Sequence, residues 1–271
     1  EPEAVKATEN VESPLKFRHF VYGVIAIFLY VGVEVGIPGT LNFYLSDSVK
    51  GAGLDPSVAV RTAGFVAGTY WLLMLVGRLV SSFISGKVSS KAQLTCVSAV
   101  AIILVLWAML SPASTQTSMP AFTGSGFEMV KVPLSALLLV LCGLCTSVMW
   151  GTIFDLAVEG LGAATNKASG IFMAMVVGGG ILPLLQNFIA DKAGYMPSYW
   201  VIVAALAFIL FFAVVLFYIY KKDITRPRWL QWAAIAMVPL AYIASESGWL
   251  LAEFGRQPWT IQDILPTWAA V

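Results

Sequence analysis

Charged residues are scarce in this sequence, and histidine is almost absent. Only 11% of the 271 residues are Asp, Glu, Lys or Arg, and one is His, whereas a soluble domain has about a quarter of its residues charged. This composition excludes a disordered chain and argues against a water-soluble enzyme. The formal net charge of +1 gives no general attraction to nucleic acid. We therefore expect no nucleic-acid partner and no histidine-rich metal site.

Cysteine is also rare, and the three cysteines lie in apolar sequence. Cys142 and Cys145 form a CxxC pair, but the stretch around them has no other candidate ligands. The sequence has no GxSxG, HExxH or P-loop motif. From these features we expect neither a disulfide framework, nor a bound metal, nor an enzyme activity.

Long hydrophobic runs, in contrast, fill most of the chain. Hydrophobic residues make up 59% of the sequence, and a transmembrane helix needs about 20 of them in succession. The runs are continuous, whereas strands of a membrane β-barrel alternate polar and apolar residues. The sequence therefore predicts an all-α membrane protein with transmembrane helices near residues 20–45, 61–84, 92–111, 132–156, 168–190, 198–220 and 230–251.

The distribution of positive charge predicts how the chain crosses the membrane. Most Lys and Arg residues fall on the side of the polar arm at residues 1–18, and the side richer in these residues is normally cytosolic. We therefore expect a multi-pass protein of a bacterial inner membrane with a cytosolic N-terminus. The longer connection at residues 112–131 would lie outside and divide the first six helices into three plus three, as an inverted repeat would.

Glu34 is the most informative polar residue, because it lies in the middle of the first apolar run. A charged side chain at the bilayer centre costs about 2.5–3.5 kcal/mol on insertion scales, so it requires a reason. Gly32, Gly36 and Pro38 are nearby and allow the helix to bend or to approach a neighbour. We expect Glu34 either to carry a proton or bind a sugar hydroxyl, or to be a structural carboxyl group bonded to another helix.

Three amide side chains are further candidates for a polar path. Asn42, near the outer end of the same helix, suits a polyol or an ordinary helix–helix contact. Gln186 and Asn187 are adjacent, so their side chains point about 100° apart on a helix. One of the two, but not both, could face a given cavity directly.

The fourth apolar run contributes an aromatic and an acidic candidate. Trp150 offers a flat face suited to the C–H side of a sugar ring, although lipid-facing tryptophans are also common. Asp155 lies near the inner end of the same run. For Asp155 we expect a helix-end or loop-anchoring role more than a substrate contact.

Basic and small residues complete the set. Arg78 lies near the inner boundary, where its side chain can extend to the headgroups, and with Lys87 and Lys91 it would form a basic inner loop. Gly64 and Gly68 form a small-residue surface that favours close packing.

Four stretches carry a family resemblance over about three quarters of the chain. They are FLYVGVEVGIPGTLNFYL at 28–45, GRLVSSFISGKVSSK at 77–91, MWGTIFDLAVEGLG at 149–162 and ASGIFMAMVVGGGILPLLQNFIADKAGY at 168–195. In order and spacing they resemble the C-terminal half of the fucose-permease-like sugar:proton symporters of the major facilitator superfamily. The resemblance implies that residues 19–222 form a six-helix half bundle and that residues 1–18 are a remnant of the central cytosolic loop.

The same resemblance implies a substrate and a partner. Hexoses or deoxyhexoses, such as fucose, galactose or glucose, would move together with protons. Gly151 stands where the family usually has proline, which alters the expected bend beside Trp150. Alternating access needs two bundles that move against each other, so we expect no coupled transport from this chain unless a second six-helix bundle pairs with it.

Residues 223–271 carry a different signature. The stretch ESGWLLAEFGRQPW at 246–259 resembles subunit I of cytochrome bd quinol oxidases, which implies a haem region containing Glu253, Arg256 and Trp259. The axial histidines and the methionine-bearing helix of that family do not occur in this sequence, so we expect no stable haem site and no cofactor.

Three functions remain open at this stage. The chain is a sugar-transporter half, a fragment of a cytochrome bd ubiquinol oxidase subunit I, or a structural helix bundle without transport. The two resemblances meet near residues 221–226, which predicts either a natural fusion that adds a seventh helix or a truncated or joined reading frame.

Overall fold

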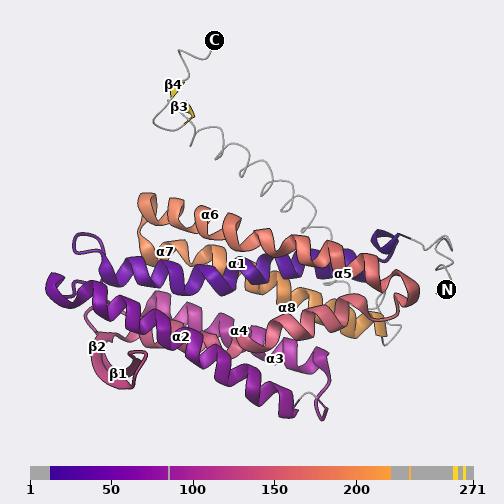
Figure 1. Ribbon diagram of the computed structural model, residues 1–271, viewed down its shortest axis with the longest axis horizontal. Helices are drawn as coiled ribbons and strands as arrows, with labels where there is room; N and C mark the ends of the chain where they lie inside the picture. The colour runs from indigo at the N-terminus through magenta and orange to yellow at the C-terminus, as the bar shows by residue number, and fades with distance from the viewer. Residues whose placement is uncertain (1–12, 85, 221–231, 233–258, 262–264, 267–271) are drawn as a thin grey trace, which may run out of the picture. The chain divides into compact units, whose positions relative to one another are not determined.

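The computed structural model describes residues 13–84, 86–220, 232, 259–261 and 265–266 (Figure 1). The chain divides into two compact units, Glu1–Phe217 and Tyr218–Val271. The predicted seventh helix at 230–251 lies outside the described residues except for Trp232. In the second unit, the described strands are β3 (Trp259–Ile261) and β4 (Leu265–Pro266), which pair antiparallel.

Six helical segments of the described chain are long and apolar enough to cross a membrane. Five of them contain one long, continuous helix. These helices are α1 (Arg18–Ser46), α2 (Pro56–Ile84), α3 (Ser90–Leu110), α4 (Leu134–Val158) and α8 (Trp200–Tyr220), with the short α7 (Tyr195–Ser198) before α8. They confirm the prediction of an all-α membrane protein built on a six-helix bundle.

The fifth segment is interrupted. It consists of η2 (Gly162–Ala164), α5 (Thr165–Ala174), η3 (Met175–Val177) and α6 (Gly178–Ala193). The 3₁₀ turn η3 separates two α-helical pieces, and Pro183 lies within the second piece. Breaks of this kind occur where a transmembrane helix must bend around a neighbour.

Helices α1 and α4 form the centre of the bundle. Helix α1 contacts α2, α4 and α6, and α4 also contacts α2 and α3. Glycines make the close approach possible: a Cβ at Gly32 or Gly36 would collide with Leu182 or Gln186 of α6, and one at Gly178 would collide with the Phe28 carbonyl of α1. Small residues at such positions let membrane helices pack tightly.

A β-hairpin connects the first three helices to the rest of the bundle. Strand β1 (Gln116–Phe122) pairs antiparallel with β2 (Phe127–Pro133), and Phe122 lies opposite Phe127. Gly124 in the turn has φ of 90°, a conformation that glycine adopts readily. The sequence analysis expected only a longer connection at residues 112–131, so this hairpin is an addition to the predicted fold.

Candidate functional site

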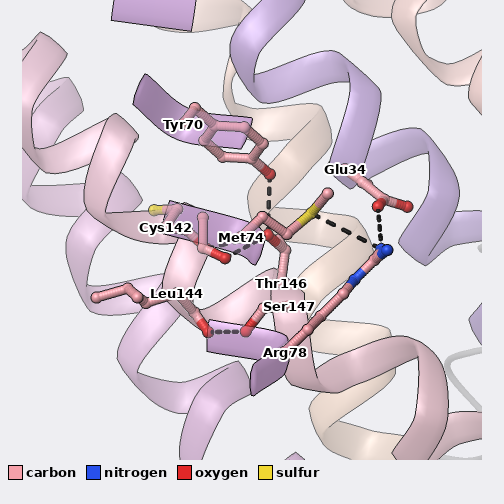
Figure 2. A network of polar contacts seen from close by, with 9 residues as sticks. Glu34, Tyr70, Met74, Arg78, Cys142, Leu144, Thr146 and Ser147 are labelled. Carbon is pink, nitrogen blue, oxygen red and sulfur yellow. Dashed lines mark hydrogen bonds and ion pairs between the residues drawn. The ribbon is translucent and has the colours of Figure 1, made fainter. Parts of the chain in front are cut away.

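An ion pair joins α1 to α2 inside the bundle. The Arg78 Nη2 group donates a hydrogen bond of 2.9 Å to Glu34 Oε1 (Figure 2). The Glu34 side chain is 12% exposed, whereas that of Arg78 is 50% exposed. Glu34 therefore has the partner that its depth requires, and Arg78 keeps donor groups available on its open side.

This pairing differs from the role expected for Arg78. The sequence analysis grouped Arg78 with Lys87 and Lys91 in a basic loop, with its side chain extended to the headgroups. Arg78 lies six residues before the end of α2, about 9 Å along the helix. Its long side chain can therefore turn inward, where the negative charge of the Glu34 carboxylate attracts the guanidinium group.

A cavity of about 480 Å³ surrounds the ion pair. Its wall combines two charged groups, two serines, an indole ring and two residues without polar side chains. The lining residues are Glu34, Arg78, Ser81, Ser147, Val148, Trp150 and Gly151. The volume is within the range of small-molecule sites, and a few convergent polar groups on an apolar wall are typical of them.

Trp150 is held at this cavity by other aromatic rings. Its ring lies edge-on to Tyr30 and to Phe172, with centroid distances of 6.1 and 5.9 Å, and Phe172 also contacts Phe154 at 5.0 Å. Such edge-to-face contacts stabilise a fixed ring orientation. Trp150 therefore forms part of the cavity wall.

Tyr30 is a site residue to which the sequence analysis gave no role. Its ring is fully buried, and its hydroxyl group has no hydrogen-bond partner among the described residues. The hydroxyl lies next to both Glu34 and Arg78. The signal in the sequence is the spacing of four residues between Tyr30 and Glu34, which places them on one face of α1.

A second polar network fixes α2 against α4 beside the cavity. Tyr70 Oη and Thr146 Oγ1 are 3.0 Å apart, Thr146 Oγ1 donates to the Cys142 carbonyl, and Ser147 Oγ donates to the Leu144 carbonyl at 2.6 Å (Figure 2). The two helices that carry Arg78 and Trp150 are therefore held in register.

The three amide candidates lie away from this cavity. Asn187 Oδ1 accepts a hydrogen bond of 3.2 Å from Thr40 Oγ1, which joins α6 to α1. Gln186 is completely buried against Gly36, and its amide has no partner among the described residues. Asn42 is half-buried near the end of α1. None of the three is among the described residues that line the cavity.

Asp155 anchors the C-terminal end of α4, one turn beyond Gly151. It accepts a hydrogen bond of 2.5 Å from Ser90 Oγ, and Lys91 Nζ lies 3.6 Å from a Glu159 carboxylate oxygen. His19 Nε2 is 3.0 Å from the Glu159 carbonyl oxygen. These contacts correspond to the loop-anchoring alternative for Asp155, while Lys87 is exposed in the same loop.

The described residues offer no cluster of ligands for a metal ion. They contain no group of three or more His, Cys, Asp or Glu side chains arranged around one point, and His19 is already engaged at Nε2. Glu253 and Arg256 lie outside the described residues. The backbone of Trp259 belongs to β3.

Comparison with known proteins gives two sets of relatives. A glucose/galactose transporter of Brucella abortus (strain 2308) is 31% identical over 215 residues, which cover 79% of this chain and 46% of that protein. The L-fucose-proton symporter of Escherichia coli (strain K12) is 26% identical over 187 residues, which cover 68% of this chain and 36% of the symporter. The chain therefore spans less than half the length of these transporters.

The fold of the bundle is similar to that of a solved transporter structure. The crystal structure of FucP, a major facilitator superfamily transporter in the outward conformation, has a TM-score of 0.60 to this chain at 20% sequence identity. The similarity covers 79% of this chain and 47% of FucP. The bundle is therefore a half bundle of the major facilitator fold.

The second set of relatives consists of respiratory oxidase subunits. The family model of cytochrome bd terminal oxidase subunit I matches residues 58–271. The cytochrome bd-II ubiquinol oxidase subunit 1 of Escherichia coli (strain K12) is 52% identical, but only over 50 residues, or 18% of this chain. The family-model range thus overlaps the transporter-like bundle, whereas the direct match is short. The six-helix bundle is similar in sequence to the glucose/galactose transporter and the L-fucose-proton symporter. By its family-model match, the chain belongs to the cytochrome bd terminal oxidase subunit I family.

Proposed function

We propose that the six-helix bundle is one half of a transporter that moves a hexose or deoxyhexose together with protons. The observation that carries the proposal is the Glu34–Arg78 ion pair in a cavity shared with Trp150. A carboxylate accepts hydrogen bonds from sugar hydroxyls, a guanidinium donates to them, and an indole ring covers the apolar side of a pyranose. Relatives named as glucose/galactose transporter and L-fucose-proton symporter support the same substrate class.

The ion pair also provides a means to couple a proton to the sugar. When Glu34 is charged, it holds Arg78 at 2.9 Å. When a proton neutralises Glu34, the electrostatic attraction is lost, and the guanidinium can turn to a ligand in the cavity. The buried Tyr30 hydroxyl is then available to the neutral carboxyl group. Proton uptake and sugar binding would in this way favour the same arrangement.

A second six-helix bundle completes the proposed transporter. The lining residues of the cavity come from α1, α2 and α4 alone, and alternating access requires a second bundle that moves against this one around the site. We expect the pair to lie in a bacterial inner membrane with residues 1–18 in the cytosol. The chain by itself would bind sugar weakly and would not accumulate it.

Two measurements on the full chain test this proposal. Equilibrium binding of labelled fucose, galactose and glucose to the purified protein is expected to weaken at least tenfold in Glu34→Gln and in Trp150→Ala. The matched control Lys50→Gln, in the exposed α1–α2 loop, should bind as the wild type does. Binding that neither variant changes would overturn the assignment of this cavity.

The second measurement tests the need for a partner bundle. The chain is reconstituted into proteoliposomes either alone or with the N-terminal half of the Brucella abortus glucose/galactose transporter. We expect proton-driven uptake only in the second case, and no such uptake with Glu34→Gln. Uptake by the chain alone would contradict the requirement for a second bundle.

The family-model match favours one alternative, a haem-binding oxidase component. A reduced-minus-oxidised absorption spectrum of the purified full chain tests it. Haem bands that disappear in Glu253→Ala would support the oxidase alternative, and a spectrum without haem bands would remove it.

A further inference from the structure

The β1–β2 hairpin has one buried face and one free face. Side chains alternate between the faces of a strand. On one face, Met119, Ala121 and Val132 are 0–2% exposed and pack against the bundle. On the other, Phe127 and Met129 are 66% and 64% exposed. The hairpin thus presents an apolar surface that nothing in the described chain covers.

The hairpin starts where a transmembrane helix ends. Helix α3 contains 21 residues and is about 31 Å long, which matches the hydrocarbon thickness of about 30 Å. Its last residue, Leu110, should therefore lie at the boundary between the hydrocarbon and the headgroups. Only five residues separate Leu110 from β1.

The tip of the hairpin lies slightly deeper than this boundary. The Phe122 amide donates a hydrogen bond of 2.8 Å to Thr69 Oγ1 of α2. Thr69 lies 15 residues before Ile84 at the far end of α2, a distance of about 22 Å along the helix. With Ile84 at the inner boundary, that distance is about 8 Å less than the hydrocarbon thickness of about 30 Å, so the hairpin folds back along α2 and its tip lies just inside the outer boundary.

Three contacts hold the hairpin in this position. Arg61 of α2 forms an ion pair of 2.9 Å with Glu128 on the hairpin's bundle-facing side. At the base, the Leu134 amide donates to the Thr115 carbonyl at 2.8 Å. A Cβ placed at Gly68 would lie 3.6 Å from the Phe122 carbonyl oxygen, an ordinary contact distance, so the hairpin backbone runs close beside α2. The free face therefore has a defined direction.

The free face continues a surface that suits lipid. At the end of α3, Trp107 and Leu110 are 56% and 82% exposed, and alternation places Lys131 on the same hairpin face as Phe127 and Met129. Aromatic rings and lysines are typical of the membrane interface. The unpaired edges of a two-stranded hairpin still need water, which places it among the headgroups and not in the hydrocarbon interior.

We propose that the β1–β2 hairpin is a membrane-interface anchor whose Phe127 and Met129 side chains insert at the boundary between the lipid headgroups and the acyl chains. The anchor would fix the level of the bundle in the bilayer at the junction of its two groups of three helices. Its partner is the lipid surface itself. The proposal does not depend on the bundle's transport substrate.

Spin labelling of the full chain in lipid vesicles tests the anchor. Cys96, Cys142 and Cys145 are first replaced by alanine, and a nitroxide is then attached at Met129→Cys. Two matched labels serve as references. Val49→Cys, at an 88% exposed residue of the α1–α2 loop, reports water, and Leu79→Cys, on the outer surface of α2, reports lipid. The quantity measured is the ratio of collisions with oxygen to collisions with a water-soluble nickel complex. We expect this ratio to be severalfold higher for the Met129 label than for the Val49 label.

Two results would overturn the proposal. Nickel access at Met129 equal to that at Val49 would place the face in water, and protection from both reagents would mean that a protein covers it. If the cysteine-free chain does not fold, the wild-type chain is labelled in vesicles with a photoreactive reagent dissolved in the lipid. The peptide that contains residues 127–131 should then be modified, and its absence among the modified peptides would equally exclude the anchor.

Discussion

Glu34 and Arg78 are 44 residues apart in the sequence but 2.9 Å apart in the structure, and they differ in their access to solvent. Arg78 remains half exposed, whereas Glu34 is almost covered. Because of this asymmetry, removing the Glu34 charge and removing the Arg78 charge have different effects on stability. The partner left behind determines how much stability is lost.

We predict that Arg78→Gln destabilises the protein by about 1–3 kcal/mol, because it leaves the covered Glu34 carboxylate without a counter-charge. Glu34→Gln should cost less, since the remaining guanidinium can be solvated. The double variant should recover part of the loss caused by Arg78→Gln. Unfolding in detergent, followed by circular dichroism, measures all three, and equal losses in the two single variants would contradict the asymmetry.

The packing of α1 on α6 predicts a strong position effect among neighbouring glycines. A Cβ at Gly178 would overlap the backbone carbonyl of Phe28, which cannot move aside as a flexible side chain would. We expect Gly178→Ala to lower the free energy of unfolding by about 1–3 kcal/mol.

Gly180 offers the matched control two residues away in the same helix. No described atom lies within 4 Å of a Cβ placed there. Gly180→Ala should therefore be neutral or add up to about 1 kcal/mol through helix propensity. A similar loss in both variants would show that helix flexibility, and not the contact with Phe28, matters at this position.

The buried amide of Gln186 predicts a gain in stability on replacement. It is fully covered and has no partner among the described residues, and such a group is costly to bury. Gln186→Leu should raise the free energy of unfolding by about 1 kcal/mol, whereas Asn187→Leu, which removes the bond with Thr40, should lower it by about 1 kcal/mol. A loss in Gln186→Leu would mean that the amide binds water or a ligand.

Asp47, just after the end of α1, predicts how stability depends on pH. Hydrogen bonds from the backbone amides of Lys50 and Val49 and from the Tyr195 hydroxyl lower the pKa of Asp47 below its ordinary value. A lowered carboxyl pKa contributes stability that is present above the ordinary value and is lost as the pH falls through the folded-state pKa.

The measurement is the unfolding midpoint as a function of pH on the acid side. Asp47→Asn should flatten this dependence, because its side chain does not titrate. Tyr195→Phe should only reduce it, since the two backbone donors to Asp47 remain. An unchanged acid branch in Asp47→Asn would assign the dependence to other carboxyl groups.

The sequence was sufficient to predict the six spans that the structure describes and to give a bond to another helix as one alternative for Glu34, because hydropathy and the cost of a buried charge act locally along the chain. It was not sufficient to identify that partner. Arg78 lies on another helix, and the rotation of one helix relative to another depends on packing that periodicity does not encode. The same reason explains why Asn187, and not Gln186, has a hydrogen-bond partner on α1.

The hairpin was missed for a different reason. Two short runs, QTSMPAF and FEMVKVP, flank the turn residues TGSG, which is a recognisable hairpin signal. Pro120 and Pro133 lie within these runs, however, and proline normally argues against a strand. In the structure both prolines belong to a two-stranded sheet, in which each strand has one edge without a partner, so a missing amide donor is tolerated.

The 3₁₀ turn η3 resets the rotational phase of the fifth span. A 3₁₀ residue advances by about 120° and an α-helical residue by about 100°, so three residues shift every later side chain by about 60°. A helical wheel drawn from Thr165 onward therefore assigns residues beyond Gly178 to the wrong azimuth. Redesign of this span should treat α5 and α6 as separate wheels, each with its own origin.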